Sequence, residues 1–94
     1  MLEKEVESYF RQKAREHRCL CFKFASPGNA GVPDRIIITP YGETVYVELK
    51  SPTGKLRPLQ KSVQARIKKQ GARVCTLHTR ADVNVFFTMV VGNR

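Results

Sequence analysis

The chain has 94 residues, which is enough for one domain, spanning residues 1–94, and no more. With 41% hydrophobic and 27% charged residues, the composition fits a folded protein and excludes a disordered one, and the longest apolar stretches are far too short to cross a bilayer. Seventeen Lys and Arg against eight Asp and Glu give a formal charge of +9, which favours a polyanionic partner, nucleic acid above all. An anionic membrane surface is the weaker alternative, because no basic amphipathic helix with a bulky aromatic face is present.

The chain opens with a predicted helix and a predicted strand. Apolar residues recur at helical spacing over residues 2–18, which indicates an amphipathic helix. The stretch 19–25 alternates instead, with Leu20, Phe22 and Phe24 on one face, which is typical of a strand.

A predicted hairpin follows. The loop 26–31 is rich in residues that break regular structure, and residues 32–39 then contain three consecutive isoleucines, as in a buried strand. A tight turn at 40–43 leads into a returning strand over 44–50.

The last third of the chain predicts helix, strand and helix. Pro58 fits the first turn of a helix over 57–70, where a missing N–H does no harm. A strand over 73–78 follows, and Thr79 is placed to cap a final helix over 80–91. The apolar stripe of the first of these helices is formed by Leu59, Val63 and Ile67.

The final predicted helix is apolar on two sides. One stripe contains Val83, Phe86, Phe87 and Val90. On the opposite side lie Val85 and Met89, and a monomer of this size has only one core to cover. We expect a homodimer formed through this C-terminal helix; the alternative is a pair of ordinary exposed aliphatic side chains.

Three cysteines, Cys19, Cys21 and Cys75, form no Cys-x-x-Cys pair. A structural zinc site needs four ligands at workable spacing, and only His17 and His78 are available to add to them. We therefore expect buried or half-buried free thiols.

Charged residues interrupt the two strands of the predicted hairpin. Asp34 and Glu48 fall on paired strands, and Glu48 and Lys50 are two apart, so they project to the same face. Burying such charges is costly for structure alone. Two carboxylates can hold a hard divalent cation such as Mg²⁺ or Mn²⁺, with the backbone carbonyl of Leu49 as a further oxygen ligand. Together with a nearby lysine, this set is suited to phosphodiester hydrolysis.

These residues also carry a family resemblance. Pro33-Asp34, a spacer of thirteen residues and Glu48-Leu49-Lys50 resemble the PD-(D/E)xK nuclease motif, and the flanking residues, with Leu56-Arg57-Pro58-Leu59-Gln60, are similar to its VRR-NUC branch. The resemblance covers nearly the whole chain and suggests a stand-alone domain of the virus-encoded or bacterial type. It implies an α/β, restriction-endonuclease-like fold in the order α-β-β-β-α-β-α, with a mixed sheet flanked by helices.

The resemblance also implies roles for individual residues. The metal ligands map to Asp34 and Glu48, the catalytic lysine to Lys50 and the supporting helix glutamine to Gln60. The family places an acidic residue on the first helix, where Glu3, Glu5 and Glu7 compete; Glu3 is preferred because it lies at the rim of the buried face. The residues expected to contact DNA phosphates are Lys23, Arg35, Lys55, Arg57, Lys61 and Lys68.

The resulting expectation is a Mg²⁺- or Mn²⁺-dependent, structure-specific DNA endonuclease that acts as a homodimer on a branched substrate, as a Holliday junction resolvase does. The alternatives are a flap or nicking endonuclease, an exonuclease of the same superfamily, or a non-catalytic basic DNA-binding module. We expect no membrane association and no small-molecule substrate. No leader or anchor is visible, so the expected location is the cytoplasm, that of the host if the protein is virus-encoded.

Overall fold

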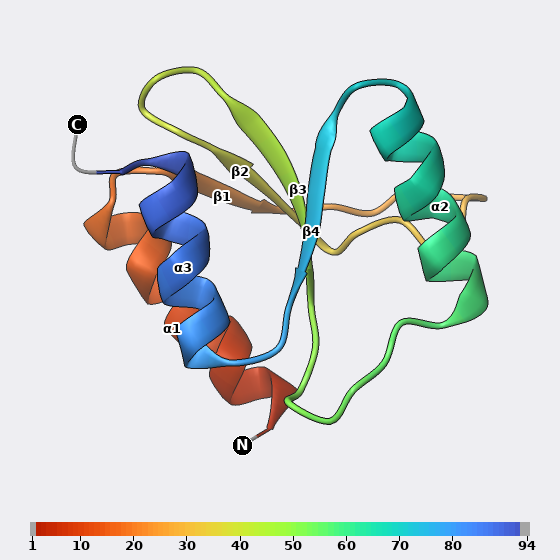
Figure 1. Cartoon of the computed structure of the whole chain (residues 1–94), viewed down its shortest axis with the longest axis horizontal. Helices are drawn as coiled ribbons and strands as arrows, with labels where there is room; N and C mark the ends of the chain where they lie inside the picture. The colour runs from red at the N-terminus through yellow and green to blue at the C-terminus, as the bar shows by residue number, and fades with distance from the viewer. Residues whose placement is uncertain (1, 93–94) are drawn as a thin grey trace.

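The computed structural model describes residues 2–92, and its elements follow the predicted order (Figure 1). Every helix and strand lies within three residues of its predicted bounds. Among the described residues, no helix combines the length and the apolar character needed to cross a membrane. The elements are α1 (Glu3–Glu16), β1 (Leu20–Lys23), β2 (Arg35–Ile38), β3 (Thr44–Leu49), α2 (Pro58–Lys69), β4 (Arg73–Leu77) and α3 (Arg80–Val90).

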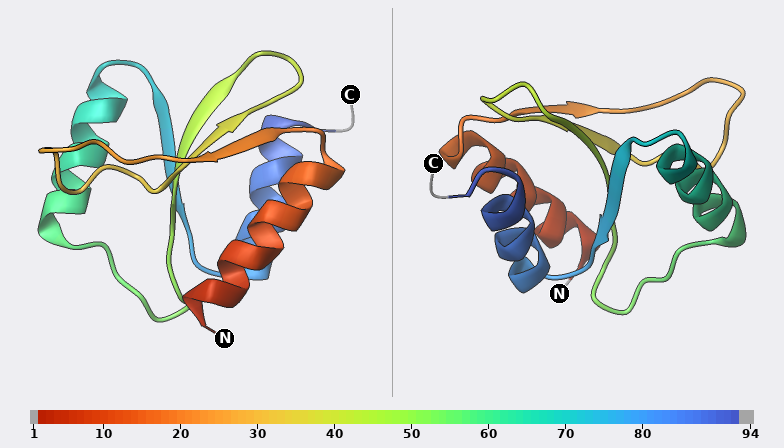
Figure 2. Two further views of the ribbon diagram at one scale, coloured as in Figure 1. Left: turned by 180° about the vertical axis from the view of Figure 1, so that it is seen from behind. Right: turned by 45° about the horizontal axis from the view of Figure 1, so that its top comes forward.

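The four strands form one mixed sheet in the order β1-β2-β3-β4. β1 pairs antiparallel with β2 and β2 with β3, whereas β3 pairs parallel with β4 after the chain has crossed over through α2. Helices α1 and α3 lie side by side on one face of the sheet, and α2 lies on the other face beside β4 (Figures 1 and 2). The α/β architecture with a mixed sheet flanked by helices is therefore confirmed.

The hydrophobic core fills the space between the sheet and the α1–α3 pair. Phe10 of α1 packs on Phe87 of α3 with 5.3 Å between ring centroids, and both side chains are buried. Val47 and Leu49 project from β3 into the same core. Because successive strand residues point to opposite faces, Glu48 and Lys50 are directed to the side of the sheet that carries α2.

Helix α2 faces the sheet with polar side chains, which differs from the predicted apolar stripe. Its buried residues are Gln60 and Gln64, whereas Leu59 is 52% exposed. The reason is the polar surface beneath it: Gln60 hydrogen bonds to Glu48 on β3 and Gln64 to Thr76 on β4. The helix is therefore oriented on the sheet by hydrogen bonds from its buried glutamines.

Helix α3 begins as predicted, with a side-chain cap. The backbone N–H of Asp82 donates to Oγ1 of Thr79 over 3.0 Å. Its predicted stripe is buried, and Val85 and Met89 on the opposite side are 58% and 70% exposed.

All three cysteines are free thiols, as predicted. Cys19 is buried in the core, and Cys21 and Cys75 pack against its edge. On β1 the cysteine face thus points to the core, which leaves Leu20 and Phe22 about half exposed on the other face.

Candidate active site

Asp34 comes directly before β2, and the strand register and two hydrogen bonds fix its position. β2–β3 pairing sets Arg35 opposite Val47, which brings Asp34 to the level of Glu48. The backbone N–H of Leu49 donates to Oδ1 of Asp34 over 3.3 Å, and the Asp34 carbonyl accepts from the backbone N–H of Phe24 over 2.9 Å. Both the side chain and the backbone of Asp34 are therefore held by neighbouring segments.

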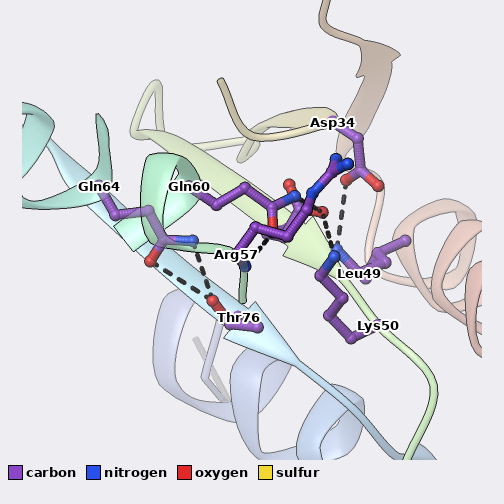
Figure 3. A network of polar contacts seen from close by, with 8 residues as sticks. Asp34, Leu49, Lys50, Arg57, Gln60, Gln64 and Thr76 are labelled. Atoms are coloured by element: carbon purple, nitrogen blue, oxygen red, sulfur yellow. Dashed lines mark hydrogen bonds and ion pairs between the residues drawn. The ribbon is translucent and has the colours of Figure 1, made fainter. Parts of the chain in front are cut away.

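Glu48 is the buried centre of the site, with 6% of its surface exposed. Its Oε2 accepts a hydrogen bond from Nε2 of Gln60 over 3.2 Å and lies 3.7 Å from Nζ of Lys50. Figure 3 shows Gln60 approaching from α2 and Lys50 following Leu49 at the end of β3, with Asp34 bonded to the Leu49 backbone. The predicted set Asp34, Glu48, Lys50 and Gln60 thus gathers at one end of the β2–β3 hairpin.

Burial makes the two carboxyl groups unusually weak acids. Desolvation, together with the nearby charge of Asp34, raises the pKa of Glu48 to about 7 against the opposing effect of Lys50. The pKa of Asp34 rises to about 6, again chiefly through burial, while the Leu49 hydrogen bond and Arg35 lower it. A site that concentrates negative charge in this way is stabilised by a proton or a cation.

The donor set fits a hard divalent cation that keeps part of its water shell. Among residues 2–92, no three His, Cys, Asp or Glu side chains gather closely enough to hold a metal ion by themselves. Asp34 and Glu48 supply two carboxylates, and the remaining ligands would be water and backbone oxygen, with the Leu49 carbonyl the predicted candidate. This is the usual coordination of Mg²⁺, which dehydrates reluctantly.

Gln60 is oriented by its own helix terminus. The backbone N–H of Arg57, at the start of α2, donates to Oε1 of Gln60 over 2.8 Å. Because the amide oxygen is engaged there, its NH₂ group is directed to Glu48. This supports the predicted role of Gln60.

Gln64 is a residue that the sequence analysis missed. Its Nε2 donates to Oγ1 of Thr76 over 3.0 Å (Figure 3), one helical turn after the Gln60–Glu48 contact. The two glutamines four residues apart give α2 a polar face, a spacing that the sequence does contain.

The three acidic candidates on α1 have different surroundings. Glu3 is exposed, and its charge raises the pKa of both Asp34 and Glu48. Glu7 forms an ion pair with Arg35 and so serves to anchor α1 to β2. Glu5 is exposed on the same helix.

The Glu7–Arg35 ion pair corrects one of the predicted DNA contacts. Arg35 is only 6% exposed and its guanidinium pairs with Glu7 inside the protein, so it is not available to a phosphate. The reason is the register: Arg35 pairs with Val47 and shares its face, which α1 covers. The other predicted contacts are exposed, namely Lys23, Lys55, Arg57, Lys61 and Lys68.

Comparisons with known proteins agree with this fold. The model of the VRR-NUC domain family matches residues 2–81. A protein of Acyrthosiphon pisum secondary endosymbiont phage 1, named "Putative nuclease p44", is 35% identical over 78 residues, which is 83% of this chain and 84% of the phage protein. A solved structure described as a VRR_NUC domain superposes with a TM-score of 0.86 at 27% identity, covering 94% of this chain and 96% of that one.

Proposed function

Since this chain belongs to the VRR-NUC domain family of nucleases, we propose that it is a metal-dependent endonuclease that cuts branched DNA as a homodimer. The observation that carries the proposal is the convergence of Asp34, Glu48 and Lys50 at one end of the central hairpin, with Gln60 fixed behind Glu48. The expected location remains the cytoplasm, that of the host for a virus-encoded protein.

Asp34 and Glu48 would hold the metal ion, Mg²⁺ or Mn²⁺, with the Leu49 carbonyl as the proposed third protein ligand. When bound, the ion supplies an activated water and neutralises charge on the phosphate. Gln60 keeps the Glu48 carboxylate in one orientation through its 3.2 Å hydrogen bond. Glu3 adds negative charge at the edge of the site, which favours cation binding.

Lys50 stabilises the phosphate during cleavage. Its ammonium lies 3.7 Å from Oε2 of Glu48, and 14% of the side chain is exposed. The positive charge is therefore positioned next to Glu48 and remains accessible to a bound phosphate. A fixed positive charge in a partly desolvated site favours the extra negative charge that develops on the phosphate oxygens.

The DNA backbone is bound by the exposed lysines and arginines around α2. Lys55 and Arg57 precede the helix, and Lys61 and Lys68 lie on it, with Lys23 on the opposite edge strand. Because phosphate contacts release counterions, binding weakens steeply with salt and is largely independent of sequence.

The preference for a branched substrate rests on symmetry. A homodimer formed through α3 sets two active sites about a two-fold axis, which matches the two equivalent strands of a four-way junction. Val85 and Met89 are the exposed apolar residues of this helix. They line a cavity of about 380 Å³ between α3 and β4, which we propose accommodates a side chain of the second copy.

The test is a cleavage assay on four-way junction, flap, nicked, duplex and single-stranded DNA with Mg²⁺ and with Mn²⁺. We expect the junction to be cut best by wild type, and Lys50→Ala to retain DNA affinity but lose about a hundredfold or more in cleavage rate. Lys13→Ala is the control, because Lys13 pairs with Glu16 on α1 away from the hairpin end.

Other outcomes would identify the alternatives. Preferred cutting of flaps or nicks, or progressive shortening from an end, would indicate a flap or nicking endonuclease or an exonuclease. Binding without cutting at any metal concentration would indicate a DNA-binding module. Equal cutting by wild type and Lys50→Ala would remove Lys50 from the reaction.

A further inference from the structure

A second concave feature, which we call the aromatic groove, lies between α2 and the loop that joins β1 to β2. Its volume is about 950 Å³. Phe24 and Tyr46 form its floor, with ring centroids 5.6 Å apart. The stripe of Leu59, Val63 and Ile67 on α2 forms one wall, which explains why this stripe is not buried in the core.

The opposite wall of the aromatic groove is a structured loop. The backbone N–H and the side-chain amide of Asn29 both donate to Ser26, over 3.0 and 2.9 Å. Gly31 has φ of +89°, and a Cβ on it would lie 3.0 Å from the backbone oxygen of Leu59. The loop therefore closes tightly on the N-terminal turn of α2, and the groove is a built feature of the fold.

Residues that line the aromatic groove are neighbours of active-site residues on both β3 and α2. Tyr46 and Glu48 are two apart on β3, so they share a face and are separated by about 7 Å along the strand. On α2, Leu59 lines the groove and the next residue, Gln60, binds Glu48. A nucleotide chain with a phosphate at Glu48 therefore has its neighbouring base within reach of Tyr46.

The chemistry of the aromatic groove favours a nucleic-acid base. Two aromatic rings offer stacking surfaces, which every base can use irrespective of sequence. Arg66 and Lys69 line the groove as well, and both are exposed, whereas no acidic residue lines it. An apolar peptide segment would contact the aromatic rings but would leave Arg66 and Lys69 without an anionic partner.

From these observations we propose that the aromatic groove binds an unstacked base of the DNA strand whose phosphate occupies the active site. The proposal rests on the proposed nuclease function and narrows its substrate to DNA in which a base beside the cut can leave the stack, as at a bulge or at the branch point of a junction, where stacking is interrupted. A fully paired duplex keeps its bases stacked and leaves the groove empty.

The experiment uses two DNA duplexes that contain one 5-iodouracil, unpaired as a single-nucleotide bulge in one and paired with adenine in the other. Affinity is measured by fluorescence anisotropy with Ca²⁺, and gels verify that neither DNA is cut. We expect wild type to bind the bulged duplex about tenfold more tightly. Phe24→Leu and Tyr46→Leu should each lose most of that preference, whereas Tyr41→Leu, which changes an aromatic residue of the hairpin turn outside the groove, should keep it.

Photocrosslinking on wild type provides a second measurement that does not depend on how well a variant folds. Irradiation of the bulged complex should link the iodouracil to Tyr46 or Phe24, as located by mass spectrometry. Equal affinity of wild type for both duplexes, or crosslinks only to residues outside the groove, would overturn the proposal, and equal affinity is also what a peptide-binding groove would give. If the protein cuts DNA but does not prefer the bulged duplex, base binding in the aromatic groove is refuted and the proposed nuclease function stands. If it prefers the bulged duplex but cuts no DNA, the proposed nuclease function is refuted.

Discussion

The buried carboxyl group of Glu48 has an amide, an ammonium group and a backbone segment as neighbours. Gln60 and Lys50 both approach the same oxygen, Oε2, and the backbone of Asp34 also hydrogen bonds to the carboxylate. The charge of Asp34 nevertheless raises the Glu48 pKa, so the two neighbours do not cancel the cost of ionisation. A residue in this situation stores an unfavourable energy that cation binding can release.

Replacing Glu48 by Gln should stabilise the metal-free protein at high pH. The folded-state pKa of about 7 exceeds the ordinary value of 4.5, so between these pH values the native state holds more protons than the unfolded state. Wild-type stability therefore falls as pH rises through this window, and the penalty is complete above it. Glu48→Gln, which does not ionise, should escape this loss.

Urea unfolding with EDTA at pH 4, 6 and 8 measures the effect. The difference between Glu48→Gln and wild type should grow from pH 4 to pH 8, and Glu16→Gln on the exposed surface of α1 is the control. A difference that stays constant over this range would show that Glu48 is not buried as a weak acid.

Gln60→Ala should weaken metal binding rather than abolish the chemistry. The change removes the hydrogen bond that orients Glu48, and loss of such a supporting contact costs on the order of tenfold in metal affinity. Cleavage should be recovered at raised Mn²⁺ concentration, and calorimetry gives the affinity directly.

Gln64→Ala is the matched control for Gln60→Ala, because it removes an equivalent amide one turn later that binds Thr76 instead. Its Mn²⁺ affinity should equal that of wild type. If both variants lost the same affinity, the effect would belong to the packing of α2 and not to the Glu48 contact.

At the scale of the elements, the alternation of side chains along a strand made the active-site residues predictable from the sequence. Contacts between residues far apart in the chain could not be predicted in this way. The spacing of Glu48 and Lys50 within an apolar strand is visible in the sequence, and so is the hairpin that returns Asp34 to it. The ion pair of Arg35 with Glu7 joins residues 28 positions apart, and no local pattern shows it. The polar face of α2 likewise depends on which sheet residues it meets, so the apolar stripe was a poor guide to its orientation.

Gly31→Ala should destabilise the protein by more than about 1 kcal/mol, because it combines a positive φ with a close approach to α2. The added Cβ would lie 2.9 Å from Cγ and 3.0 Å from the backbone oxygen of Leu59, and the helix backbone cannot move easily.

Gly28→Ala separates the two effects of the Gly31 change. Gly28 also has a positive φ, +80°, but a Cβ there would meet nothing within 4 Å. Urea unfolding of both variants should show a clearly larger loss for Gly31→Ala. Equal losses would mean that only backbone conformation matters and that the loop does not press on α2.

At the scale of the whole molecule, exposed apolar residues outside the aromatic groove occur on both faces of the sheet. Val85 and Met89 lie on α3, and Leu20 and Phe22 lie on the open face of β1. Val85 and Met89 line the cavity between α3 and β4, so theirs is the surface that we propose for the homodimer. A small monomer with a modest core gains stability from covering such a surface.

The double substitution Val85→Lys and Met89→Lys should therefore shift the protein from dimer to monomer in light scattering after size exclusion. Charges placed within an apolar interface are costly to bury, whereas they are harmless on a free surface. The thermal midpoint should then lose its dependence on protein concentration. Phe22→Lys is the control, and a monomer obtained from it alone would assign the interface to the sheet face instead.

The three free cysteines determine how selectively this protein can be labelled with a thiol-reactive fluorophore. Burial raises the pKa of Cys19 and Cys21, and it raises the pKa of Cys75 to about 12. Since the thiolate is the form that reacts with maleimides, the native sulfurs are slow to label. A single cysteine introduced at an exposed position such as Lys61 can then be labelled selectively with a fluorophore. The three native cysteines, which contribute to the core, need not be replaced.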